Sequence, residues 1–343
     1  MTNLEQAGMD EIYPGEKEKA NMANHNDATD NETNINEQDL SGFANVYMIE
    51  LLYKEKPQLS KQALYEKMQQ YTGEVQLPEE KVTPANSEDS LAVWETNKDK
   101  PDESESGVIL FFHMNHMVPF QEGPLPAQTC IMTSERAPQV ESYESALQQA
   151  WHWTEAREAV AGCSHSLLLT DFCARGLDYK ERLQLITGAL RALLETAPCE
   201  AVYFRASDKI VQPQVYLEAI NAGQRLYGAM NVRFYNVEGR DSGRDEMLID
   251  TCGLAALGVS DVQCHFYDME PNEVASLVGD IAYYIFEQGD VIRDGETVGS
   301  EELRWLCEHQ HALAAPPRYV LDLNPGPEHY AGIQHHDQEG GTE

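Results

Sequence analysis

The sequence predicts an α+β fold, a mixed β-sheet with helices packed on it. Two observations lead to this prediction. In the first half of the chain, apolar runs of strand length and amphipathic stretches follow one another as strand, helix, strand, hairpin partner, helix and strand, which is the order of a split β-α-β unit. In the second half, strands and helices alternate in a similar way. We therefore expect two related split β-α-β (ferredoxin-like) subdomains.

The first strand is expected at residues 44–53, where apolar side chains occupy both faces and Glu50 is the single charged exception. A helix follows from Ser60, a favourable N-cap, to about Tyr71, with Gly73 just beyond its end. The other elements expected in this half are an edge strand at 91–95, two hairpin strands at 108–114 and 127–133, a helical region at 143–162 and a strand at 164–170.

The second half contains the strongest helical patterns. Apolar side chains recur at helical spacing from Tyr179 to about Ala197. Asp178 precedes this helix, and Glu181 follows three residues later, which is the spacing of a capping box. The other elements expected here are strands at 200–206, 231–237, 262–266 and 318–323, a short helix beginning at Pro213, and helices at 246–257 and 272–287.

Composition divides the chain into segments. Residues 1–42 are rich in Asn, Asp, Glu and Gln, so they cannot bury enough apolar surface to offset chain entropy and are predicted to form a disordered acidic arm. The remaining segments are a first subdomain at 43–171, which includes an acidic excursion at 74–106, a second subdomain at 172–328 and a polar tail at 329–343.

The charge balance is strongly acidic. Within 343 residues, 24 Lys and Arg stand against 58 Asp and Glu, a formal net charge of −34. Nucleic acids and anionic membranes attract proteins through Lys and Arg, so we expect neither as a partner. The surplus of acids has two interpretations, a well-solvated surface or a decoy for basic partners.

The seven cysteines contain no CxxC spacing, which is typical of a reducing compartment and not of a disulfide framework or a zinc module. The N-terminal stretch lacks the basic start and apolar core of a secretory signal. No apolar segment approaches the roughly 20 residues of a membrane helix. These features predict a soluble cytoplasmic protein.

Four polar residues are candidates for chemistry. Asp171 follows a buried strand at its carboxyl end, where sites of α/β proteins often lie. His165 shares the face of that strand but stands about 20 Å away along it, so the two do not form an acid-base pair. His113 and His265 also lie in predicted strands. Asp178 is explained by its helix cap.

The segment HMNHM places His113 and His116 three residues apart. On a strand they point to opposite faces, so only a tight turn would bring both to one metal ion, and no third ligand is nearby. The sequence also lacks GxGxxG after a strand, GxxxxGK[ST], HExxH, GxSxG and the kinase signatures. We therefore predict no metal and no cofactor.

Four stretches of the second half carry a resemblance. They are CSHSLLLTDFCARGLDYKERL, LYGAMNVRFYNVEG, the run from LIDTCGLAALGVSDVQCHF to IRDGETVG, and RYVLDLNPGP. They resemble a bacterial family known as domain-of-unknown-function family 4261, over roughly residues 43–328. The resemblance implies a bacterial, soluble protein, and it brings no catalytic or binding residues.

We expect a non-enzymatic interaction or regulatory module that binds a protein or a small ligand through the cleft or seam between its subdomains. The first alternative is a hydrolase-type enzyme that uses Asp171, His165, His113 and His265, which requires at least three of them to converge. The second alternative is an acidic decoy, which requires acids gathered on one face. The ligand, the partner and the oligomeric state stay open.

Overall fold

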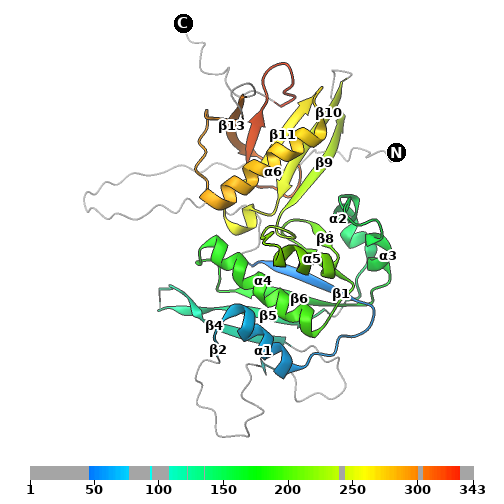
Figure 1. The fold of residues 1–343 in the computed structure, drawn as a ribbon, viewed down its shortest axis with the longest axis vertical. Coiled ribbons are helices and arrows are strands. Elements are labelled where there is room, and N and C mark those ends of the chain that lie inside the picture. The colour runs from blue at the N-terminus through cyan, green and yellow to red at the C-terminus, as the bar shows by residue number, and fades with distance from the viewer. Residues whose placement is uncertain are drawn as a thin grey trace, which may run out of the picture. The chain divides into compact units, whose positions relative to one another are not determined.

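The structure is a computed structural model and describes residues 46–76, 93–94, 108–121, 123–134, 136–238, 244–299 and 304–332. The predicted acidic arm, most of the predicted excursion and the end of the polar tail lie outside these residues. The described residues form two β-sheets and six α-helices (Figure 1). The predicted α+β fold is confirmed.

The first sheet is built around β1 (Met48–Tyr53), which pairs with β6 (His165–Phe172) and β7 (Ala201–Phe204). Its strand order is β2-β4-β5-β6-β1-β7-β8, and β3 also pairs with β4. The remaining bounds are β2 (Val75–Gln76), β3 (Val93–Trp94), β4 (Val108–Val118), β5 (Leu125–Thr133) and β8 (Lys209–Val211).

All strand pairs of the first sheet are antiparallel. Strands β6 and β7 therefore run parallel to each other with β1 between them, and α4 (Tyr179–Thr196) connects them. This is one split β-α-β unit of the predicted kind. The subdomain boundary predicted at 171/172 stays a prediction. It falls within β6, and β6 and β7 belong to one sheet.

Helices cover both faces of the first sheet. On one face, α1 (Lys61–Thr72) and α4 pack together, and α5 (Pro213–Asn221) adds Tyr216 to the same core (Figure 1). On the other face lie a 3₁₀ turn, η1 (Val140–Tyr143), and two short helices, α2 (Glu144–Gln148) and α3 (Ala156–Ala161). The helical region predicted at 143–162 is thus three short pieces.

Of the two interactions in the capping box predicted for α4, only the one made by the Asp178 side chain is present among the described residues. Asp178 Oδ1 accepts from the backbone N–H of Lys180 at 3.0 Å and of Glu181 at 3.3 Å, which satisfies free donors of the first turn. The Glu181 carboxylate does not complete the capping box, because it binds His116 instead.

The second sheet has the order β12-β13-β14-β11-β10-β9. Its bounds are β9 (Asn231–Glu238), β10 (Asp245–Cys252), β11 (Asp261–Tyr267), β12 (Thr297–Gly299), β13 (Arg304–His311) and β14 (Tyr319–Asn324). Helix α6 (Pro271–Gln288) packs against β9, β10 and β11 (Figure 1). Strands β11 and β14 are parallel neighbours, so this sheet does not repeat the split arrangement of the first.

The prediction of a helix at 246–257 is wrong. Residues 245–252 form β10, and a 3₁₀ turn, η2 (Ala255–Leu257), follows. Strand β10 is buried on both faces and pairs with a strand on each side. Its sequence, DEMLIDTC, does not alternate between apolar and polar residues, so periodicity alone does not identify it as a strand.

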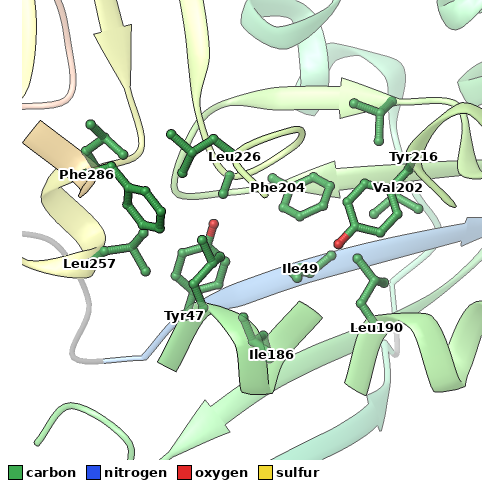
Figure 2. Close-up of a cluster of buried hydrophobic side chains, with 14 of the residues drawn as sticks. Tyr47, Ile49, Ile186, Leu190, Val202, Phe204, Tyr216, Leu226, Leu257 and Phe286 are labelled. Atoms are coloured by element: carbon green, nitrogen blue, oxygen red, sulfur yellow. The ribbon is translucent and has the colours of Figure 1, made fainter. Parts of the chain in front are cut away.

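One hydrophobic core extends across both sheets. Figure 2 shows Leu257 of η2 and Phe286 of α6 beside Tyr47, next to side chains of β1, α4 and β7. All three of these side chains are buried. Among the described residues, no helix combines the length and the apolar composition that crossing a bilayer requires.

Candidate functional site

Asp171 is a structural residue in the first sheet. Its carboxylate accepts from Arg182 Nε at 2.6 Å and from Arg182 Nη2 at 3.1 Å, and the backbone N–H of Tyr47 donates to it at 2.6 Å. Only 1% of the surface of Asp171 is exposed. These donors occupy both carboxylate oxygens and the side chain is buried, so the Asp171 carboxylate is not available to a ligand.

His113 and His116 lie close together because the pairing of β4 with β5 shifts between His113 and Met117. The two rings meet edge to face with centroids 6.3 Å apart. His113 Nε2 lies 2.9 Å from Thr129 Oγ1, and His116 Nδ1 lies 2.6 Å from Glu181 Oε1. Within the part of the chain that the structure describes, no three His, Cys, Asp or Glu side chains form a group that could hold a metal ion.

The other two candidates lie elsewhere. His165 begins β6, at the end opposite Asp171, and its Nδ1 contacts Ser164 Oγ at 2.9 Å. His265 belongs to the second sheet, where its Nε2 lies 3.2 Å from Glu246 Oε2 and burial lowers its pKa. The structure therefore does not bring together the convergent set that the hydrolase alternative requires.

A different charged side chain stands in β1, an interior strand of the first sheet. Glu50 lies opposite Leu168 of β6 and Tyr203 of β7, with 5% of its surface exposed. Side chains alternate along a strand, so Glu50 points away from the main core, which contains Ile49 and Leu51. A buried carboxylate is costly unless charged or polar groups surround it.

Arg205 and Tyr143 are the charged and polar groups that surround the Glu50 carboxylate. Arg205 Nη2 donates to Glu50 Oε2 at 3.2 Å. The Tyr143 ring meets the Tyr203 ring edge to face, with centroids 5.2 Å apart. Burial, reinforced by the neighbouring Glu50 carboxylate, raises the pKa of Tyr143 well above its usual range. Tyr143 therefore keeps its proton at neutral pH and stays a hydrogen-bond donor.

A cleft of about 780 Å³ opens over these residues, and we call it the Glu50 cleft. Its volume is in the range of small-molecule sites. One wall comes from β1, β7 and the residue after β7, and the other from the segment that joins β5 to η1. Polar and charged side chains of that segment are Ser134, Arg136 and Gln139, and η1 adds Ser142 and Tyr143.

The turn that carries Arg136 is anchored to the sheet. The backbone N–H of Ser134 donates to the Ser166 carbonyl at 3.0 Å. Ser134 Oγ donates to the Arg136 carbonyl at 3.0 Å and accepts from the Arg136 N–H at 3.3 Å. The Arg136 side chain is exposed and makes no ion pair with a described residue. Its guanidinium is therefore open to solvent at the cleft wall.

The charge of the Glu50 cleft is opposite to that of the chain. Its described lining contains two guanidinium groups, Arg136 and Arg205, and one carboxylate, Glu50, which leaves a surplus of one positive charge. The whole chain has a net charge of −34. The lining is therefore a local exception to the acidic composition.

Sequence reasoning missed this site. The sequence contains one indication of this site, which is that Glu50 is the single charged residue in an otherwise apolar strand. Arg205 lies 155 residues away along the chain, and no motif connects it to Glu50. The pairing of β1 with β7 brings them together.

The second sheet contains an ion-pair network that is closed to water. Arg233 donates to both carboxylate oxygens of Asp250, at 2.9 and 2.5 Å. Arg318 donates to Asp250 at 2.6 Å and to Asp261 at 3.1 Å. Asp261 also accepts from the backbone N–H groups of residues 253–255. All four charged residues are buried, so the network is part of the core.

Most of this network falls in one stretch of the chain. Residues 250–324 match the model of DUF4261, a domain of unknown function. The match supports the resemblance that the sequence indicated. The DUF4261 stretch runs from the end of β10 to β14, and the lining of the Glu50 cleft lies outside it. No curated protein and no solved structure matches the chain.

Proposed function

We propose that the chain is a binding module whose Glu50 cleft takes a small anionic molecule, recognised through a carboxylate or a phosphate group. The observation that carries this proposal is the presence of two guanidinium groups, Arg136 and Arg205, on the walls of a cleft in a chain of net charge −34.

The chemistry of the guanidinium favours an anion. Arg has five N–H donors in a planar fork that matches the oxygens of carboxylate and phosphate groups. Arg205 uses one of its nitrogens on Glu50, and half of its side chain is exposed. Glu50 thus holds Arg205 in place while donors of Arg205 remain directed to solvent. Other arginines, such as Arg182 and Arg233, are buried against carboxylates.

The surrounding groups favour a small hydrophilic molecule. The hydroxyls of Ser142 and Tyr143 and the amide of Gln139 line the cleft beside the arginines. Anions are bound most tightly where charged donors and neutral donors converge on one group. The proposal is a binding role and not hydrolysis, because Asp171, His165 and His265 lie apart and each has its own partner.

Calorimetric titration of the whole chain at low ionic strength tests the proposal, with inorganic phosphate and succinate as the two probes. We expect saturable binding of at least one probe. A hydrogen bond to a charged group contributes about 1.5 to 3 kcal/mol, so R136Q and R205Q should each weaken binding by about tenfold or more.

The matched control is R157Q. Arg157 is as exposed as Arg205 and pairs with Glu144 on a helix near the cleft, but it does not line the cleft. This variant removes the same charge and should keep the affinity of the unmodified chain. Absence of binding by both probes, or an equal loss in R157Q and R205Q, would contradict a specific anion site.

A further inference from the structure

The ion pairs of the Glu50 cleft leave one guanidinium without a counter-charge. Arg205 Nη2 donates to Glu50 Oε2 at 3.2 Å, so these two opposite charges of the lining compensate each other. Arg136, on the other wall, is exposed and makes no ion pair with a described residue. The uncompensated positive charge of the described lining is therefore that of Arg136.

The Glu50 carboxylate is fixed in place and weakly screened. Strand β1 has a paired strand on each side of Glu50, so the backbone cannot carry this residue away from the cleft. Only 5% of its surface is exposed, and solvent and salt screen a buried charge much less than an exposed one. A negative group that enters the cleft beside Arg205 is therefore attracted by the guanidinium and repelled by Glu50.

These charges limit the charge of a ligand. One carboxylate on Arg136 brings the described lining and its ligand together to neutrality. A second negative charge finds no further uncompensated cation, because Arg205 already has Glu50 as its partner. Phosphate monoesters have a charge of about −1.5 to −2 at pH 7, so they carry this second charge as well. Repulsion between like charges is one way in which a site rejects the wrong ligand.

The neutral groups of the lining favour hydroxyl groups on the ligand. Gln139 Nε2 donates to the carbonyls of Ala137 and Pro138 at 3.3 and 3.2 Å, which leaves Oε1 as an acceptor. The Ser142 hydroxyl both donates and accepts. Burial raises the pKa of Tyr143, so its hydroxyl adds no negative charge at neutral pH. An acceptor such as Gln139 Oε1 suits a hydroxyl of the ligand and not a second carboxylate.

We infer that the ligand of the Glu50 cleft is a hydroxylated monocarboxylate, and that Glu50 sets this specificity by repelling a second negative charge. The inference rests on the anion site of the proposed function and names its ligand class. The carboxylate meets Arg136 and the remaining donors of Arg205, and the hydroxyl groups meet Gln139 and Ser142. Glu50 acts through Arg205, which it positions, and through its own charge.

Titration calorimetry of the whole chain at pH 7 and low ionic strength tests the ligand class with lactate and tartronate. Both probes have a carboxylate beside a hydroxyl, and tartronate has a second carboxylate where lactate has a methyl group. We expect lactate to bind more tightly by a factor of about ten or more, because tartronate brings the second charge beside Glu50. Equal or tighter binding of tartronate would overturn the inference.

The substitution E50Q tests the role of Glu50. Glutamine has the shape of glutamate, and its oxygen still accepts from Arg205, so the variant removes the charge and keeps the contact. The preference for lactate over tartronate should fall by a factor of about ten or more, through a gain in the affinity for tartronate. E50D keeps the charge and should keep the preference. An unchanged preference in E50Q would refute the role of Glu50.

The matched control is E141Q. Glu141 lies in η1 next to Ser142, is exposed and does not line the cleft. Its removal changes the net charge of the chain by the same amount, and the preference for lactate should stay as it is. Equal changes in E141Q and E50Q would show a general charge effect and contradict the inference. Circular dichroism and the thermal midpoint establish that each variant is folded.

The outcomes separate this inference from the proposed function. Absence of saturable binding by lactate, tartronate, phosphate and succinate would refute the anion site, and the inference with it. Binding of these anions without a preference for a single charge would leave the anion site in place and refute only the specificity assigned to Glu50.

Discussion

At the scale of single residues, His113 is a histidine whose pKa the fold lowers strongly. It is fully buried, Nε2 has Thr129 as its partner, and Nδ1 has none among the described residues. Burial, with a smaller contribution from His116, lowers the pKa of His113 to about 3. The folded protein therefore holds this imidazole in its neutral form.

This shift makes stability depend on pH. The unfolded chain takes up the proton near pH 6.5 and the folded chain only near pH 3, so stability is complete above pH 6.5 and falls as the pH decreases toward 3. Between pH 7 and pH 5 the loss from His113 is about 2 kcal/mol. In urea unfolding at these two pH values, H113Q should lose about that much less than the unmodified chain.

The exposed His311 provides the control. H311Q should keep the pH dependence of the unmodified chain. If H113Q also kept it, the lowered pKa of His113 would be refuted.

At the scale of elements, Gln149 protects the edge of the second sheet. Strand β9 is the last strand of that sheet, and an unpaired edge invites pairing with other chains. Gln149 Nε2 donates to the Phe234 carbonyl at 3.0 Å, and the Phe234 N–H donates to Gln149 Oε1 at 3.1 Å. A side-chain amide thus makes the two hydrogen bonds that a further strand would make.

Removal of this amide should weaken the edge. We expect Q149A to lower the free energy of unfolding by about 1 to 2 kcal/mol, because two hydrogen bonds are lost, and to speed hydrogen exchange of the Phe234 amide. Gln214, which pairs with Glu218 on the exposed surface of α5, is the control, and Q214A should change stability by less than about 0.5 kcal/mol. Equal effects of the two substitutions would contradict the edge role.

At the scale of the whole molecule, Arg182 links the two sheets. It forms the buried ion pair with Asp171 of the first sheet, and its Nη1 donates to the Ala256 carbonyl in η2 at 3.2 Å. Tyr47, whose N–H donates to Asp171, lies in the core that the sheets share (Figure 2). This pair therefore lies at the junction of the sheets.

Neutralising one partner tests this link. D171N leaves the Arg182 guanidinium buried without its counter-charge, which costs about 3 to 5 kcal/mol, and chemical unfolding measures the loss. The exposed pair of Glu144 with Arg157 is the control, and E144Q should change stability far less than D171N, because solvent screens an exposed ion pair. A loss in D171N as small as that in E144Q would mean that Asp171 is not part of the junction.

Much of the fold was predictable because local signals are strong in this chain. Ser60 and Asp178 cap their helices, glycines end α1 and α6, and apolar stripes mark α4 and α6. The prediction failed at β10, where burial on both faces removes the alternation that marks a strand. The short β8 and the largely polar β13 were not predicted, since neither carries a continuous apolar run.

The candidate sites depend on contacts between distant parts of the chain. Sequence alone determined the α+β class, most of the elements and the acidic balance, because propensity, periodicity and charge are properties of neighbouring residues. Only the tertiary structure decided that Asp171 is an ion-pair partner, that Arg205 and Tyr143 meet Glu50, and that Arg136 lines the same cleft. Strand pairing and helix packing set the distances between these side chains, so the contacts exist only in the folded protein.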